Sequence, residues 1–135
     1  MNLIDKYLPV PYLKEGRTLA GLDCWGLVLA IRAELGLPGL PEIGAVSRDT
    51  VQAMQHAFAD ITYLLDRGEP RVGSMAAVFR GKVFIHVGLV LEIEGRLAVI
   101  ETNPLGGVRW SFLPRFLDLY YKVVFYCDRN IPEQT

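Results

Sequence analysis

Residues 83–103, VFIHVGLVLEIEGRLAVIETN, predict two antiparallel strands and so decide the class of fold. Both halves of this stretch are rich in aliphatic and β-branched residues, which favour strands. Glu94 and Gly95 between them suit a two-residue hairpin loop. Similar runs lie before and after the hairpin, so we expect an antiparallel sheet to form around it.

The first strand of this hairpin carries a histidine on the face opposite its aliphatic side chains. With a period of two, the face that we expect to join the core comprises Ile85, Val87, Leu89, Leu91 and Ile93. The other face comprises Phe84, His86, Gly88, Val90 and Glu92. A glycine two residues after the histidine lets another segment or a substrate approach closely.

The second strand offers polar partners for this histidine. With a two-residue loop, Gly88 lies opposite Glu101 and His86 lies opposite Asn103. Either polar side chain could accept the second N–H of the imidazole and fix its tautomer, as the third member of a catalytic triad does. A longer loop would bring Thr102 to this face instead. The residues alone therefore leave the partner of His86 open.

An earlier segment, GLDCWGL at 21–27, places a cysteine at the expected start of a helix. Apolar residues recur at helical spacing after Cys24, Asp23 suits the N-cap, and Gly36 with Pro38 ends the run. A helix N-terminus favours a thiolate and can stabilise an oxyanion, whereas a neighbouring carboxylate opposes the thiolate unless it turns to cap the helix. The residues alone allow Cys24 to be either a core residue or a nucleophile.

The remaining elements place helices before strands. They are expected at 47–61 (a helix capped by Ser47 or Asp49), 74–79 (a strand), around Trp110 (a strand), 116–121 (a helix) and 122–127 (a strand). Residues 1–22 show no sustained period, so we expect them to pack irregularly. This order predicts an α+β fold with N-terminal helices on an antiparallel sheet, in one domain spanning 1–135.

Composition excludes several classes of function. With 14 basic and 15 acidic residues, the net charge of -1 provides no positive field for nucleic acid or an anionic membrane. No apolar run approaches the roughly 20 residues of a membrane helix, and the N-terminus lacks the apolar core of a secretory signal. We therefore expect a protein made in the cytoplasm that binds neither nucleic acid nor membrane.

The remaining cysteine and histidine suggest no second site. We expect His56 on a helix surface, Cys127 in strand packing, and both cysteines as thiols. Two cysteines and two histidines without a CxxC or HxxxH pair predict no metal site. Because no phosphate-binding loop follows a strand, we expect no cofactor.

The order of the motifs resembles that of the NlpC family of papain-like cysteine peptidases of the bacterial cell wall. The matching residues are Pro11-Tyr12, GLDCWGL, Val72-Gly73 before MAAVF, HVGLVLE and LAVIET. The tryptophan that follows the cysteine in DCWGLV resembles the sequence pattern of one branch of this family, which is found in bacteriophage and prophage tail gene clusters.

This resemblance implies a papain-like fold in which Cys24 is the nucleophile, His86 the base and Glu101 the third catalytic residue. It also implies that Tyr12 helps to bind the oxyanion near Cys24. The implied reaction is hydrolysis of peptide bonds in peptidoglycan stem peptides. Without a signal peptide, delivery would be by a virion or by lysis, and phage tail proteins would be further partners.

The chain departs from the family pattern in three ways, and the departures at Glu101 and Ser74 motivate an alternative function. The family more often has His, Asn or Gln at the position of Glu101, and Asp at the position of Ser74. The double glycine that commonly follows the tyrosine is absent from LKEGRTLAG. The alternative is a tail-assembly or structural protein that keeps the fold with weak or no hydrolytic activity.

Overall fold

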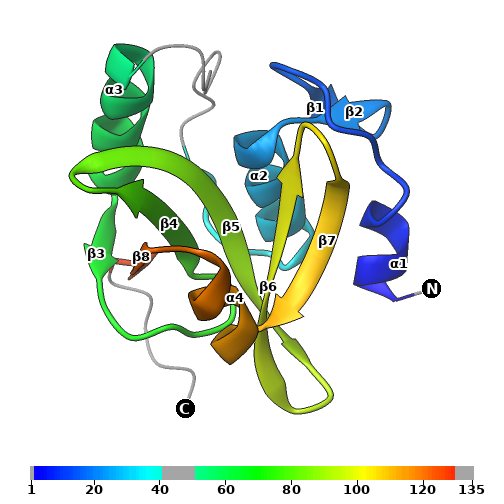
Figure 1. The fold of residues 1–135 in the computed structure, drawn as a ribbon. Coiled ribbons are helices and arrows are strands. Elements are labelled where there is room, and N and C mark those ends of the chain that lie inside the picture. Colours follow the sequence, from blue (N-terminus) through cyan, green and yellow to red (C-terminus); the bar gives the residue numbers. More distant parts are fainter. Residues whose placement is uncertain (1, 41–50, 130–135) are drawn as a thin grey trace.

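The computed structural model describes residues 2–40 and 51–129 and shows an α+β fold (Figure 1). The elements, in chain order, are α1 (Leu3–Tyr7), β1 (Arg17–Thr18), β2 (Gly21–Leu22), α2 (Cys24–Glu34), α3 (Val51–Thr62), β3 (Leu65–Arg67), β4 (Met75–Arg80), β5 (Val83–Ile93), β6 (Arg96–Asn103), β7 (Gly107–Phe112), α4 (Leu113–Leu119) and β8 (Lys122–Asp128). A six-stranded antiparallel sheet has the order β3-β8-β4-β5-β6-β7. The predicted α+β class with an antiparallel sheet is confirmed.

The hairpin of β5 and β6 has the register that a two-residue loop requires. Leu89 pairs with Ile100, and the pairing continues without a shift to Ile93 opposite Arg96. Both loop residues have a positive φ, 53° at Glu94 and 76° at Gly95, as a type I′ turn needs. The predicted loop is therefore confirmed, and so is the predicted register over the paired residues from Leu89 to Ile93.

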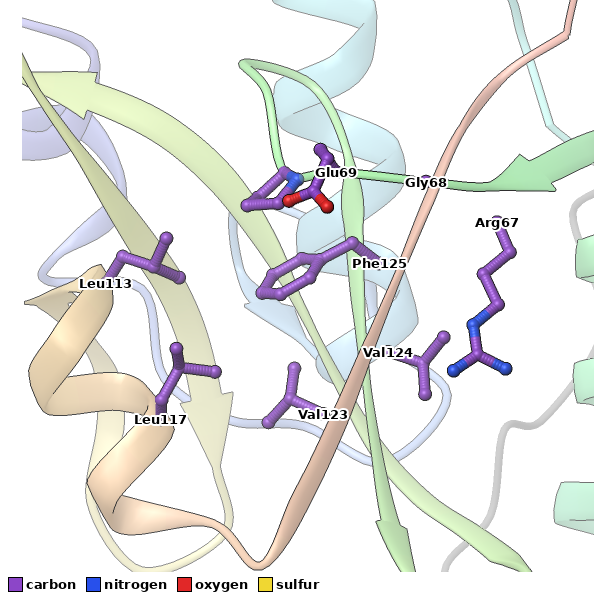
Figure 2. A pocket seen from close by; sticks show the side chains of 9 residues that line it. Arg67, Gly68, Glu69, Leu113, Leu117, Val123, Val124 and Phe125 are labelled. Atoms are coloured by element: carbon purple, nitrogen blue, oxygen red, sulfur yellow. The ribbon is translucent and has the colours of Figure 1, made fainter.

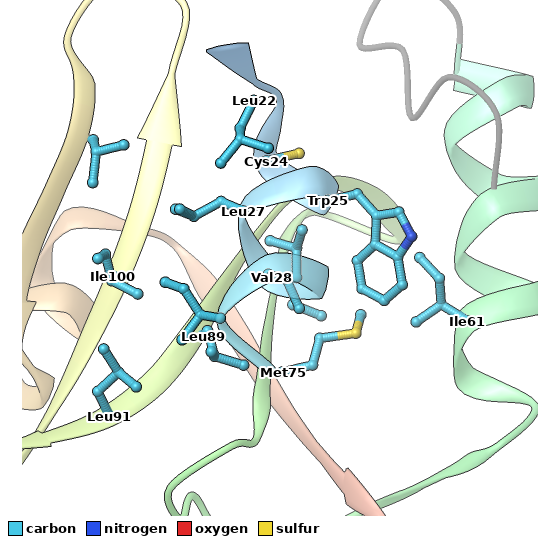
Figure 3. Packing of buried hydrophobic residues seen from close by; sticks show 14 of the residues in the cluster. Leu22, Cys24, Trp25, Leu27, Val28, Ile61, Met75, Leu89, Leu91 and Ile100 are labelled. Carbon is cyan, nitrogen blue, oxygen red and sulfur yellow. The ribbon is translucent and has the colours of Figure 1, made fainter. Parts of the chain in front are cut away.

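Helices cover both faces of the sheet. α2 and α3 pack against β5 on one face, while α4 packs against β6 and β7 on the other. Figure 3 shows the first apolar cluster, in which Leu27 of α2 meets Leu89 and Ile100 of the hairpin. The second cluster contains the buried side chains Ala76, Val78, Val90, Val99 and Phe116. Strand β5 is thus buried on both faces.

The prediction of which side chains face the core was wrong at the start of β5. The period of two put Ile85 in the core and Phe84 on the other face. The register with β4 shifts here, because Val78 pairs with His86 whereas Phe79 pairs with Phe84. Ile85 is the extra residue at this register shift and forms a bulge, which reverses the alternation of side chains. Phe84 therefore joins the first cluster, and Ile85 packs against the second.

The chain before Cys24 is more ordered than its sequence suggested. It forms α1, the short β1–β2 pair and an isolated parallel bridge between Tyr12 and Leu22. Strand β3 was not predicted either, because its three residues are too few to show a period. The expected irregular packing of residues 1–22 was wrong.

The other predicted elements are present. Strands β4, β7 and β8 match the expected segments, whereas the short helix α4 spans Leu113–Leu119 and so begins three residues and ends two residues earlier than expected. The proposed caps of α3, Ser47 and Asp49, lie outside the described residues. No helix in the described part of the chain combines the length and apolar character needed to cross a membrane.

Gly88 provides a test of the close approach between β5 and β6. A Cβ at this position would lie 2.7 Å from Val99 Cγ1 and 3.0 Å from the carbonyl oxygen of Ile100. We expect Gly88→Ala to lower the free energy of unfolding by about 1–3 kcal/mol, measured by urea denaturation, because the strands must separate. Gly106→Ala is the control, since a Cβ there meets nothing within 4 Å. Equal stability of the two variants would contradict the close approach.

Candidate active site

A buried hydrogen bond joins His86 on β5 to Glu101 on β6. The distance from His86 Nε2 to Glu101 Oε1 is 2.8 Å, and both side chains have an exposed fraction of 0%. The two-residue loop places Glu101 on the same face of the sheet as His86, whereas the neighbouring Thr102 points to the opposite face. Of the three partners left open by the sequence, Glu101 is the one whose carboxylate meets the imidazole.

Asn103, the other polar candidate, lies in the same cluster. Its Nδ2 donates a hydrogen bond of 3.2 Å to Glu101 Oε1, the same oxygen that meets His86. The structure therefore brings Asn103 to Glu101 and gives it a supporting contact. Both polar residues of the second strand belong to one cluster, with the carboxylate at its centre.

Two further side chains, which the sequence did not reveal, bind Glu101. The Tyr120 hydroxyl, just after α4, donates to Glu101 Oε1, and Arg109 Nε on β7 donates to Oε2 at 3.2 Å. Arg109 lies directly opposite Glu101 in the ladder of β6 and β7. Extending the strand register across the loop at 104–106 would have found Arg109. No local signal identifies Tyr120, because its contact depends on how α4 packs.

These donors determine the charge state of Glu101. Burial by itself would raise the pKa of this carboxyl, but hydrogen bonds from His86, Tyr120 and Asn103 outweigh burial and hold the pKa at about 2. Burial and the hydrogen bond to Glu101 raise the pKa of Tyr120. At neutral pH, the cluster therefore contains a carboxylate and a neutral phenol.

Cys24 is the first residue of α2 and has an exposed fraction of 1%. Asp23 is the N-cap, as predicted, and its Oδ1 accepts hydrogen bonds from the Gly26 amide at 2.7 Å and from Arg17 Nη1 at 2.6 Å. The carboxylate is thus directed to the helix end and to a cation. This arrangement reduces the electrostatic penalty that Asp23 would impose on a thiolate at Cys24.

Tyr12 lies beside the segment that leads into Cys24. Its bridge partner is Leu22, and hydrogen bonds from the Leu22 amide to the Pro11 carbonyl and from the Leu13 amide to the Leu22 carbonyl flank this bridge. Tyr12 is half-buried. The backbone thus holds Tyr12 next to the chain entering α2.

Cys24 belongs to the first apolar cluster, whereas His86 lies next to a member of the second. Cys24 packs in the first cluster with α2, next to Leu22 and Trp25 (Figure 3). His86 lies opposite Val78, a member of the second cluster, and its ring centroid is 5.5 Å from that of Tyr120. α2 itself packs against β5 and β6, the strands that carry His86 and Glu101.

The other histidine and the other cysteine, His56 and Cys127, lie in surroundings that suit a structural role. His56 is exposed on α3, as predicted. Cys127 is buried in β8, where its Sγ lies 3.3 Å from Ser74 Oγ and donates to the Glu69 carbonyl at 3.3 Å. Both cysteines are thiols. Across residues 2–40 and 51–129, no group of three or more His, Cys, Asp or Glu side chains is arranged to hold a metal ion.

Two surface pockets lie near α4. One, of about 590 Å³, lies between α4 and β8 and is lined by apolar side chains such as Leu117 and Phe125 (Figure 2). None of its lining residues belongs to the Glu101 cluster. The other, of about 370 Å³, is lined by Ile85, Tyr120 and Tyr121 and therefore adjoins that cluster.

Comparison with family models and with curated proteins does not identify a family for this chain. No protein-family model matches this chain, and no curated protein matches it. The class defined by the structure is an α+β protein with a buried histidine–carboxylate pair on its sheet and a cysteine at the start of the helix packed on that sheet.

Acid denaturation tests the charge state of Glu101. Because the folded pKa of about 2 lies below the ordinary value of 4.5, the carboxylate stabilises the fold above pH 4.5, and this contribution is lost as the pH falls toward 2. We expect Glu101→Gln to lower the free energy of unfolding at pH 7 by about 1–3 kcal/mol. The difference from the wild type should shrink between about pH 5 and pH 3.

Glu92→Gln is the matched control, because Glu92 is an exposed carboxylate on β5. Urea denaturation from pH 3 to pH 7 measures all three proteins. A constant difference between wild type and Glu101→Gln across this range would show that Glu101 is not held as a carboxylate by the fold.

Proposed function

We propose that the protein is a cysteine peptidase with a papain-like, NlpC-type fold that hydrolyses peptide bonds in peptidoglycan stem peptides. The observation that supports this most strongly is the buried hydrogen bond of 2.8 Å between His86 and Glu101. It lies on the strands against which α2, the helix that begins at Cys24, is packed. The order of sequence motifs supports the same assignment.

The proposed chemistry begins with the tautomer of His86. Because Glu101 accepts a hydrogen bond at Nε2, that nitrogen carries the proton of the neutral imidazole and Nδ1 is the basic nitrogen. Nδ1 removes the proton from the Cys24 thiol, and the thiolate attacks the carbonyl carbon of the substrate. The resulting imidazolium gives its proton to the leaving amine, and water then hydrolyses the acyl-enzyme.

The start of α2 supplies the electrostatic part of this mechanism. The amide of Cys24 and the hydroxyl of Tyr12 donate hydrogen bonds to the oxyanion of the tetrahedral intermediate. The helix N-terminus also favours the thiolate form of Cys24. Asp23 does not oppose this effect strongly, because it is engaged by the Gly26 amide and by Arg17.

The resemblance to tail-associated relatives suggests how such an enzyme would reach its substrate. In this proposal the protein is made in the bacterial cytoplasm and is carried to the cell wall by a phage tail or released by lysis. Phage tail proteins are then its protein partners, and the peptidoglycan stem peptide is its substrate.

One observation favours a second candidate, a tail-assembly or structural protein with little hydrolytic activity. Cys24, His86 and Glu101 have exposed fractions of 1%, 0% and 0%, and a polymeric substrate needs access to the nucleophile. Under this candidate, the Glu101 cluster stabilises the sheet and Cys24 is a packing residue. Cys24→Ala would then still support the assembly of particles.

Digestion of purified peptidoglycan tests the peptidase. We expect the wild type to release stem-peptide fragments, each new end carrying the mass of one added water, and Cys24→Ala to release them about a thousandfold more slowly or not at all. Cys127→Ala is the control, because that thiol is buried in β8 beside Ser74. Mass analysis of the products measures the reaction. Equal digestion by the wild type and Cys24→Ala would contradict the proposal.

Alkylation tests whether His86 acts on Cys24. If the two form a catalytic pair, iodoacetamide at pH 6 should modify Cys24 faster than a free thiol, and His86→Gln should remove this advantage. Peptide mapping by mass distinguishes Cys24 from Cys127, the internal reference. A rate at Cys24 that is as slow as that at Cys127 and unaffected by His86→Gln would favour the second candidate.

A further inference from the structure

Glu101 has more hydrogen-bond donors than the orientation of one histidine requires. Its Oε1 accepts from His86, Asn103 and Tyr120, and its Oε2 accepts from Arg109. A single acceptor would be enough to fix the tautomer of His86. The additional donors must therefore serve the carboxylate itself, whose burial is costly without them.

Arg109 and Tyr120 act as one unit around this carboxylate. Arg109 Nη2 donates to the Tyr120 hydroxyl at 3.3 Å, so the two donors to Glu101 are also joined to each other. They come from β7 and from the segment after α4, outside the hairpin that carries His86 and Glu101. Two separate parts of the fold thus fix the orientation of the carboxylate from the side away from β5.

These donors also affect the charge that His86 experiences. An isolated buried carboxylate would orient the imidazole but would also favour its protonated form strongly. A guanidinium on the other oxygen and a phenol on the shared oxygen offset part of that negative charge. We propose that Arg109 and Tyr120 are positioning residues, which hold Glu101 in one orientation and share its charge so that it orients His86 without locking it as an imidazolium.

Strand β4 and helix α2 bring no charged side chain with a described contact to the pair. From β4, the residue opposite His86 is the apolar Val78. From α2, the one basic side chain in the described helix, Arg32, is bound to Asp128 and to the carbonyls of Gly73 and Pro38. The charged groups with described contacts at the pair are thus Glu101 and Arg109, with Tyr120 and Asn103 as neutral donors.

The consequence for catalysis rests on the proposed function, but the effect on His86 can be measured without any activity. NMR of the full chain labelled with ¹⁵N-histidine reports the tautomer and the titration of each ring, and His56→Gln assigns the second signal. In Arg109→Gln and in Tyr120→Phe, we expect His86 to bind a proton about threefold more tightly, so that its titration midpoint moves to higher pH. Arg109→Lys should restore most of the wild-type behaviour.

Two matched variants control for loss of charge and of a hydroxyl. Arg96→Gln removes an exposed guanidinium that stacks on Phe112, and Tyr121→Phe removes the hydroxyl of the neighbouring, fully exposed tyrosine. Neither should change the titration of His86. Arg109 is half exposed, and Tyr120→Phe keeps the ring, so both test variants should fold. Titration midpoints equal to those of the controls would overturn the proposal.

Peptidase assays separate this inference from the proposed function. If peptidoglycan is hydrolysed through Cys24, the acidic limb of kcat/KM should move to higher pH in Arg109→Gln and Tyr120→Phe, in parallel with the NMR titration, because His86 must be unprotonated to act as the base. If hydrolysis depends on Cys24 but the His86 titration is unchanged in both variants, the positioning role fails while the peptidase stands. If the wild type hydrolyses nothing and the titration still shifts, the proposed function fails while the positioning role stands.

Discussion

The buried carboxylate of Glu101 is the constraint on which the arrangement of this sheet depends. A carboxylate removed from water is strongly destabilising unless hydrogen bonds and charges replace the lost solvent. Its donors come from β5, β6, β7 and the segment after α4. All four parts must therefore be in register at once, which ties the ends of three strands and one helix to a single charged group.

The start of α2 is a second constraint, and it depends on the segment before the helix. A Cβ on Gly26 would lie 2.3 Å from the carbonyl oxygen of Gly16, so only a glycine allows the preceding chain to pass over the first turn. Arg17 from the same segment binds the N-cap Asp23. The segment before α2, whose sequence shows no sustained hydrophobic period, therefore determines the surroundings of Cys24.

The sequence predicted best what depends on local patterns. The cap at Asp23, the loop at Glu94 and Gly95 and the register that brings Glu101 to His86 all follow from short-range signals. The bulge at Ile85 does not follow from such signals, because it depends on how β4 pairs with β5.

Non-local pairing also explains the rest of what the sequence could not predict. Strand β8, the last in the chain, inserts between β3 and β4, the first two strands of the sheet. This order depends on contacts between residues far apart in sequence, which periodicity does not encode. Tyr120 reaches Glu101 because the short α4 ends just before β8 begins, so one of the donors to the carboxylate was not predictable from any motif.

The chemistry available to the Glu101 cluster is narrower than its number of polar groups suggests. Glu101 has a lowered pKa and Tyr120 a raised one, and the arginine guanidinium stays charged. Histidine is the side chain that exchanges protons near neutral pH, so proton transfer by this cluster passes through His86. With Nε2 held by Glu101, the exchanging atom is Nδ1. Whether the cluster is catalytic thus depends on the group that meets Nδ1, and in the proposed peptidase that group is the Cys24 thiol.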